Sequence, residues 1–429
     1  MAGGRTRRPG FAAAPYNRPV PRLLLLIPTS SYRTTDFLEA SRKLGVEVTV
    51  ASEEPSTMEP WHPEGFLTLD FRDPERAAGQ VAEFARRFPV AAVVGVDDET
   101  AVAAAAIALA LNLPHVPIAA AVAARHKATM RRALAEAAVP QPQFRLFSTE
   151  GSPEEAAARV TFPCVLKPTF LAASRGVIRA NGPSEFLSAW RRISRILEEP
   201  EAAGKGGAWA REILVEDYVP GREVAVEGLL HDGELSILAL FDKPDPLEGP
   251  YFEETIYVTP SRLPGETQRA IAQVTGHAAL ALGLRRGPIH AELRVSAAGP
   301  IVIEIAGRSI GGLCSRVLRF GAGMSLEELL LRDALSLPIA DSSRESPAAG
   351  VMMIPIPAGG ILEEVAGVEQ ARHVTGIEEV TISAHLGQRL IPLPEGSRYL
   401  GFLFSRADTP AGAEEALRQA HSKLKFRIR

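Results

Sequence analysis

Short apolar segments alternate with amphipathic segments along the first quarter of the chain. Leu23–Ile27 and Val46–Ala51 are rich in aliphatic residues, and Asp36–Leu44 between them has helical periodicity. A third apolar segment, Val90–Val96, precedes an alanine-rich helical segment that ends near Leu111. Strands that alternate with helices are typical of parallel sheets. The pattern therefore predicts a small Rossmann-like α/β layer. Its first strand is not followed by a GxGxxG motif, so we do not expect a dinucleotide site there.

The rest of the chain mixes long helices with strands that follow one another directly. One uninterrupted helix is expected over Ala120–Ala138, and the glycines between residues 204 and 207 indicate an exposed turn. His231–Gly233 reads as a hairpin turn between two strands. Further helices are predicted over Glu185–Glu198, Thr267–Leu282 and Ala413–Leu424, and further strands over Val165–Lys167, Ile213–Glu216, Glu223–Leu230, Glu234–Leu240, Ile289–Val295 and Ile301–Ile305. After a linker-like segment at 341–346, a final αβ portion runs from Val351 to the end.

Composition and charge narrow the class of protein. The chain has 429 residues, enough for two to four domains, and a net charge of −4, so no global basic field points to nucleic acid or an anionic membrane. Its two cysteines, Cys164 and Cys314, are too few for a disulfide framework or a thiolate metal site, which fits the cytoplasm. Arginines and prolines dominate residues 1–21, which we expect to be a disordered tail rather than a signal peptide.

Two lysines lie where they could neutralise phosphate. Lys167 ends an apolar strand, and the loop that follows it, through Ser174 and Gly176, could fold over a phosphate with its backbone N–H groups. Lys127 lies within the helix expected over Ala120–Ala138. Taken alone, Lys127 is better explained as a solvated helix lysine, whereas Lys167 favours neither reading, because a lysine inside an apolar strand needs a partner.

A strand that ends in an acid, turns and resumes with another acid could form a nucleotide hinge. Glu216, Tyr218 and Val219 come before the Pro-Gly turn, and Glu223 follows it. Such a hinge offers backbone donors and acceptors to a purine edge, while Glu223 could accept hydrogen bonds from ribose hydroxyls. An ordinary hairpin with charged edges explains the same pattern.

Two carboxylates lie in strands that are expected to pair in antiparallel fashion. This pairing would bring Glu292 close to Glu304, and two hard carboxylates beside a triphosphate form a Mg²⁺ site. Glu304 lies in the run Ile-Val-Ile-Glu-Ile, where an unpaired carboxylate is costly, so a cation is expected beside it. The alternative is a simple salt bridge to Arg308. Three acids, Asp97–Glu99, precede the alanine-rich helix, and their default role is to cap it.

At these residues the chain resembles the ATP-grasp superfamily, and within it the carboxylate–amine ligases, which include bacterial L-amino-acid ligases. The resemblance covers about residues 20–429 and rests on four motifs in the same order. It implies a fold that combines α/β and α+β parts: a Rossmann-like pre-ATP-grasp domain at 22–122, a two-lobed ATP-grasp domain at 123–338 and a C-terminal α+β closing domain at 347–429.

The resemblance also implies ATP and Mg²⁺ (or Mn²⁺) as cofactors and a role for each matching residue. The phosphate contacts would be Lys127, Lys167, Ser174 and Gly176, the adenine hinge Glu216, Tyr218 and Val219, the ribose acid Glu223, the metal ligands Glu292 and Glu304, and the catalytic residues Arg308 and His290. His290 is also explained as a core histidine. Two departures are a lid loop, Thr169–Ser174, that lacks the usual glycines, and Ala306 where relatives place an asparagine metal ligand.

The implied activity is an ADP-forming ligase that activates a small-molecule carboxylate as an acyl phosphate for attack by an amine. The alternatives are an enzyme of the same fold that activates bicarbonate, and a non-catalytic ATP-binding protein. The segment from Asp242 to Thr255 is a candidate substrate loop, and a merely solvated loop explains it equally well. Tyr399–Phe402 reads as core and Cys314 as a packing residue. Neither a nucleic acid nor a membrane partner is expected. A homodimer is common in the superfamily, but no pattern in the sequence identifies one.

Overall fold

The computed structural model describes residues 20–429, and the tail predicted for residues 1–21 lies almost entirely outside this range. Near the N terminus a four-stranded parallel sheet has the strand order β3-β2-β1-β4. Leu23–Leu26 of β1 are fully buried because helices cover both faces of a parallel sheet. The elements are β1 (Arg22–Leu26), α1 (Thr34–Leu44), β2 (Glu47–Ser52), β3 (Phe66–Thr68), α2 (Pro74–Arg87), β4 (Ala92–Gly95) and α3 (Asp98–Ala110).

The single helix expected over Ala120–Ala138 is wrong, because two helices meet there at His126. They are α4 (Ile118–Arg125) and α5 (Lys127–Glu136). The His126 backbone is extended, with φ −104° and ψ 103°, and its imidazole accepts the backbone N–H of Thr129. A histidine cap of this kind leaves no glycine or proline in the sequence to reveal the break. Lys127 therefore begins a helix instead of lying in the middle of one.

A second sheet is small, antiparallel and ordered β5-β8-β6-β7. Its elements are β5 (Phe144–Ser148), α6 (Pro153–Ala157), β6 (Cys164–Pro168), β7 (Ile178–Ala180), α7 (Pro183–Glu198), α8 (Pro200–Gly206), the 3₁₀ turn η1 (Gly207–Arg211) and β8 (Glu212–Asp217). The exposed turn expected between residues 204 and 207 is instead the end of α8. Gly206 is buried against the Phe170 ring, where an added Cβ would lie 2.3 Å from a ring carbon.

The largest sheet has eight strands in the order β13-β12-β9-β10-β11-β16-β20-β18. Its first strands in the sequence are β9 (Arg222–His231), β10 (Glu234–Asp242), β11 (Ile256–Thr259), β12 (Gly287–Ser296) and β13 (Gly299–Ala306), and helix α9 (Gly265–Ala281) connects β11 to β12. The predicted hairpin at His231–Gly233 is confirmed, with positive φ at Asp232 and Gly233. The predicted pairing of β12 with β13 is also confirmed, and it places Glu292 opposite Glu304.

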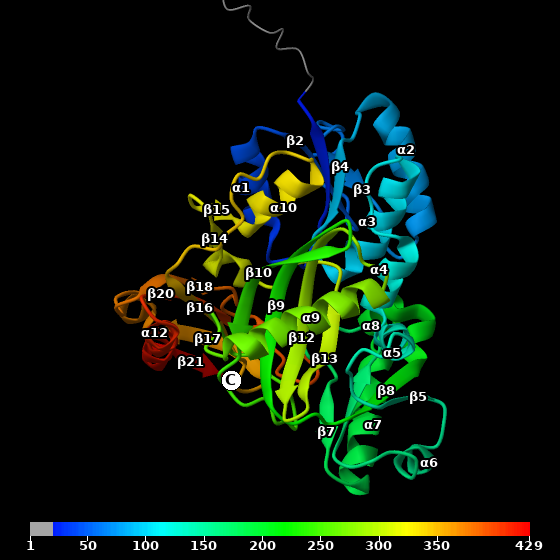
Figure 1. Ribbon diagram of the computed structural model, residues 1–429, viewed down its shortest axis with the longest axis vertical. Helices are drawn as coiled ribbons and strands as arrows, with labels where there is room; N and C mark the ends of the chain where they lie inside the picture. The colour runs from blue at the N-terminus through cyan, green and yellow to red at the C-terminus, as the bar shows by residue number, and fades with distance from the viewer. Residues whose placement is uncertain (1–19) are drawn as a thin grey trace, which may run out of the picture.

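The C-terminal portion adds three strands, β16, β20 and β18, to this same sheet (Figure 1), and its other strands form a small sheet with the order β19-β17-β21. The short strand β11 pairs with β10 on one side and with β16 on the other. The remaining elements are η2 (Cys314–Val317), β14 (Arg319–Phe320), β15 (Met324–Ser325), α10 (Leu326–Ala334), β16 (Ala348–Ile354), β17 (Gly360–Ala366), α11 (Val368–Arg372), β18 (Ile377–Ile382), β19 (Arg389–Leu390), β20 (Gly401–Ala407), α12 (Pro410–Lys423) and β21 (Lys425–Ile428). Among the described residues, no helix has the length and apolar character needed to cross a bilayer.

Candidate active site

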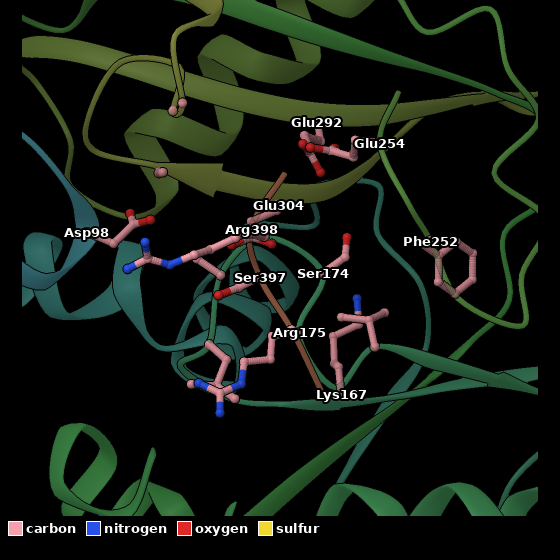
Figure 2. Close-up of a pocket in the computed structure, with 18 of the residues that line it drawn as sticks. Asp98, Lys167, Ser174, Arg175, Phe252, Glu254, Glu292, Glu304, Ser397 and Arg398 are labelled. Carbon is pink, nitrogen blue, oxygen red and sulfur yellow. The ribbon is translucent and has the colours of Figure 1, made fainter. Parts of the chain in front are cut away.

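One cleft, with a volume of about 820 Å³, lies where the N-terminal parallel sheet, the small antiparallel sheet and the eight-stranded sheet meet. Segments far apart in the sequence line it, from the end of β1 and the start of α3 to the C-terminal segment 388–399. In Figure 2, Glu254 and Glu292 lie together on one side of the cavity and Lys167 lies on the opposite side. The cleft brings together the predicted site residues Lys127, Lys167, Ser174, Glu216, Tyr218, Val219, Glu223, His290, Glu292, Glu304 and Arg308, and only Gly176 of the predicted set does not line it.

Lys167 and Glu216 form a buried ion pair at the floor of the cleft. Lys167 Nζ lies 2.7 Å from one Glu216 carboxylate oxygen, and Arg131 Nε donates to the other at 2.6 Å. Burial raises the pKa of Glu216, but the two cations outweigh this effect and lower the pKa to about 2. Glu216 is therefore ionised, and it holds the Lys167 ammonium at the rim of the sheet. Arg131, which the sequence analysis did not single out, lies one helical turn after Lys127 on α5.

Lys127 joins the lid loop to the predicted metal ligand Glu304. Its Nζ donates to the Leu171 carbonyl at 2.8 Å and to Glu304 at 3.0 Å, and its side chain is 7% exposed. The reading of Lys127 as a solvated helix lysine is therefore wrong. The alternative salt bridge between Glu304 and Arg308 is also wrong, because Arg308 pairs with Asp98.

Three carboxylates surround a single buried lysine beside the predicted metal site. Lys243 Nζ donates to Glu223 at 2.8 Å, to Glu292 at 2.9 Å and also to Glu254. Burial alone would lower the pKa of Lys243, but the three acids raise it well above its ordinary value. Burial and the neighbouring Glu292 raise the pKa of Glu254 to about 7. Lys243 is therefore a resident cation inside an acidic cluster.

The same carboxylates have the chemistry of a divalent-cation site. Glu223, Glu254 and Glu292 each offer an oxygen, and these three oxygens lie within 4.8 Å of one another. Hard carboxylate oxygens are the ligands that Mg²⁺ and Mn²⁺ take in proteins. The residues present therefore fit such an ion. Of the predicted pair, Glu292 belongs to this cluster, while Glu304 lies opposite it on β13 and faces Lys127.

His290 is held in place by Glu227, which is fully buried. His290 Nδ1 lies 3.2 Å from a Glu227 carboxylate oxygen, and its Nε2 lies 3.7 Å from Glu292. Burial lowers the pKa of His290, but the bonds to these two acids overcome it and raise the pKa to about 9. Glu227 also accepts the backbone N–H of Ile310 at 3.0 Å, so it ties β12 to the segment after Arg308.

The hinge after β8 is held by Arg294. Its guanidinium donates to the Val219 carbonyl at 2.9 Å, to the Tyr218 hydroxyl at 3.2 Å and to Glu223 at 2.9 Å. Arg294 lies two residues after Glu292 on β12, so the alternation of the strand places both side chains on one face. Glu223 thus belongs to both the hinge and the acidic cluster. The hinge is better organised than an ordinary hairpin with charged edges.

The lid loop and the glycine that follows it are held by hydrogen bonds to two other segments. Lys127 N–H donates to the Thr169 carbonyl at 2.7 Å, and Gly176 N–H donates to the Pro394 carbonyl at 2.8 Å. Ala173 and Ser174 both have positive φ, 52° and 56°, although neither is a glycine. The loop therefore turns at Ala173 and Ser174, which the sequence did not indicate as turn residues because neither is a glycine. The hydrogen bond from Gly176 joins the end of this loop to the C-terminal portion of the chain.

Several residues in or beside the cleft were given no such role from the sequence. Lys243 and Glu254 lie within the candidate substrate loop, but only their meeting with Glu292 shows what they do. Two of the acids assigned to capping form ion pairs instead, Asp98 with Arg308 and Glu99 with Lys205. Tyr399, read as core, lines the cleft beside Ser397 and Arg398, whereas Phe402 is buried as expected. The two cysteines are buried, and burial raises the pKa of both thiols.

Comparison with known families matches three consecutive parts of the chain. The ATP-grasp N-terminal domain matches residues 38–115, the ATP-grasp domain matches 160–317, and the L-amino acid ligase C-terminal domain 2 matches 352–429. Among solved structures, the L-amino acid ligase from Bacillus licheniformis has a TM-score of 0.78 and 25% identity, and the match covers 96% of this chain and 100% of that one.

Three related sequences match this chain over different shares of their own length. Carnosine synthase 1 from Gallus gallus is 30% identical over 81% of this chain and 40% of its own length, and the alanine–anticapsin ligase of Bacillus subtilis strain 168 is 29% identical over 52% and 49%. The uncharacterized protein y4rH of Sinorhizobium fredii is 23% identical over 95% and 83%. This chain thus spans about half or less of the two named ligases. It belongs to the ATP-grasp superfamily, in the branch of carboxylate–amine ligases similar to the L-amino-acid ligases.

Proposed function

We propose that this chain is an ATP-dependent, ADP-forming ligase that joins the carboxylate of one small molecule to the amine of another. The observation that carries the proposal is the convergence of Lys127, Lys167, Glu292 and Glu304 on one cleft. Two ammonium groups opposite an acidic, cation-binding wall suit a bound triphosphate. The L-amino acid ligase and the alanine–anticapsin ligase among the similar proteins support the same class of reaction here.

The first step transfers the terminal phosphoryl group of ATP. A carboxylate oxygen of the substrate attacks the γ-phosphorus, the bond to the β-phosphate oxygen breaks, and ADP and an acyl phosphate result. Lys127 and Lys167 offset the charge of the phosphates, while Tyr218, Val219 and Glu223 hold the nucleoside. Glu292 and Glu304 would hold Mg²⁺, which would neutralise further phosphate charge, while Glu223 and Glu254 hold Lys243. Closure of the lid loop keeps water from the intermediate.

The second step forms the C–N bond. The amine attacks the carbonyl carbon of the acyl phosphate, the C–O bond to phosphate breaks, and the nitrogen loses a proton as phosphate leaves. Arg308, and His290 in its protonated form, can stabilise the oxyanion of the tetrahedral state. The raised pKa of His290 keeps this imidazole charged at neutral pH.

Release of ADP and phosphate with a panel of carboxylates and amines tests the proposal, with mass spectrometry of products from ATP and pooled amino acids. We expect release that depends on both substrates and a new amide in the products. Glu304→Gln should lose turnover, because it removes a carboxylate beside the phosphates. Normal turnover by this variant, or release that needs bicarbonate and gives no amide, would contradict the assignment.

A further inference from the structure

We propose that Asp98 is a positioning residue for Arg308, and that Arg33 locks the two segments that carry this pair. The N-terminal sheet then supplies part of the reaction centre instead of only supporting it. The inference rests on the proposed function, in which Arg308 stabilises the acyl-transfer step. Asp98 lies at the start of α3, directly after the end of β4.

The first contact is the ion pair itself. Arg308 Nη2 donates to Asp98 Oδ2 at 2.6 Å, and the two side chains are 14% and 24% exposed. Burial alone would raise the pKa of Asp98, but Arg308 outweighs this effect and lowers it. Both partners are therefore charged. A short, largely buried ion pair fixes the rotamer of a long arginine far better than an exposed one does.

A second contact joins the same two segments in parallel. The Arg33 side chain is 1% exposed; its Nη1 donates to the Val96 carbonyl at 3.1 Å and its Nη2 to the Ser309 hydroxyl at 2.7 Å. Val96 lies two residues before Asp98, and Ser309 directly follows Arg308. The Asp98–Arg308 pair and the Arg33 hydrogen bonds thus both hold the segment after β4 against the Arg308 segment. The two segments can move apart only if both sets of contacts break.

The arrangement leaves Arg308 able to bind an anion. Its Nη1 donates to the carbonyl of Ser309 and its Nη2 to Asp98, whereas Nε has no hydrogen-bond partner within residues 20–429. Arg308 lines the cleft, and Asp98 lines it from the side opposite Phe252 (Figure 2). A guanidinium that is held at one end before the substrate arrives is pre-organised for the charge that develops in the transition state.

The test compares Asp98→Asn and Asp98→Glu with a matched control in the full chain. The control, Asp36→Asn, breaks a similar ion pair, in which Asp36 accepts from Arg316 at 3.0 Å and the two side chains are 12% and 24% exposed. This pair also joins the N-terminal part of the chain to the segment after Arg308, but it lies outside the cleft. We expect Asp98→Asn to lower kcat for amide formation about 10- to 100-fold, less than the roughly 10²–10³-fold loss of an oxyanion contact itself, because Arg308 stays in place but is no longer held. The KM for ATP should change less than twofold, and Asp98→Glu should recover part of the rate.

A second measurement does not need catalysis. Phenylglyoxal modifies free guanidinium groups, so Asp98→Asn should increase the rate of modification at Arg308 about tenfold or more, followed by peptide mass spectrometry, while Asp36→Asn should not. Equal modification rates in wild type and Asp98→Asn would overturn the inference, as would equal losses of kcat in Asp98→Asn and Asp36→Asn. If the wild type forms no amide, the proposed function fails, and the modification rates still decide whether Asp98 holds Arg308.

Discussion

Lys243→Met tests whether the three carboxylates of the acidic cluster depend on their resident cation. The Lys243 side chain is 3% exposed, and its ammonium donates to Glu223, Glu254 and Glu292. Removing one partner of a buried ion pair costs about 3–5 kcal/mol, because the remaining charges stay buried without compensation. Methionine keeps most of the volume of the lysine stem, so a cavity adds little. We therefore expect the free energy of unfolding to fall by about 3–5 kcal/mol in the absence of divalent ions.

The assay is urea denaturation followed by circular dichroism, in EDTA and in a Mg²⁺ titration. A divalent cation can replace the lost ammonium, so Mg²⁺ should stabilise the variant by about 2.7 kcal/mol at one hundred times its dissociation constant, and the wild type by less. Lys205→Met is the control. The Lys205 ammonium also bonds to two glutamates, but this side chain is 31% exposed, so the free energy of unfolding should fall by only about 0–1 kcal/mol. Equal stability of Lys243→Met and wild type in EDTA, or equal gains from Mg²⁺, would refute the reasoning.

Three further changes test other parts of the molecule. The folded-state pKa of Glu216 is about 2, below its ordinary value of 4.5, so this carboxylate contributes about 3 kcal/mol to the free energy of unfolding above pH 4.5, and the contribution is lost as the pH falls toward 2. The acid denaturation curve of Glu216→Gln should therefore lack this pH dependence. A curve like that of the wild type would contradict the assignment. Cys164 and Cys314 should resist iodoacetamide in the folded chain and react in urea, as read by mass spectrometry, because burial raises the pKa of both thiols and excludes the reagent; labelling of the folded chain would disprove this. Gly176→Ala should raise the KM for ATP and lower the denaturation midpoint, because φ is +75° and the new Cβ would lie 2.7 Å from Pro168; an unchanged KM would separate this glycine from nucleotide binding.

Local patterns were sufficient for most strands and for the antiparallel pairing of β12 with β13. Apolar runs of four to eight residues identify strands, and the short turn between Ser296 and Gly299 requires antiparallel pairing. The register at this turn would place Glu292 opposite Ile303, and it is a bulge beside Leu293 that brings Glu304 opposite Glu292. The lysine at the end of β6 was found in the same way, because a charge inside an apolar strand needs a partner. These inferences depend on neighbours within about fifteen residues.

Contacts between distant segments could not be read from the sequence. Asp98 and Arg308 are 210 residues apart, and nothing local distinguishes Asp98 from an acid that caps a helix. Lys243 likewise reads as one charge in a loop until β9, β12 and the segment before β11 bring three acids around it. The break at His126 was missed for a different reason, because an imidazole cap replaces the usual serine, threonine or aspartate.

The eight-stranded sheet limits how this enzyme can be divided or recombined. A cut within residues 335–347 would separate β11 from β16 and leave each with a row of unpaired backbone N–H and C=O groups. Such open edges template aggregation, so the two fragments should precipitate alone and reassemble when mixed. Chimeras that exchange the C-terminal portion with a relative must therefore preserve the register of Ile256 opposite Met352, in addition to any residue that contacts a substrate.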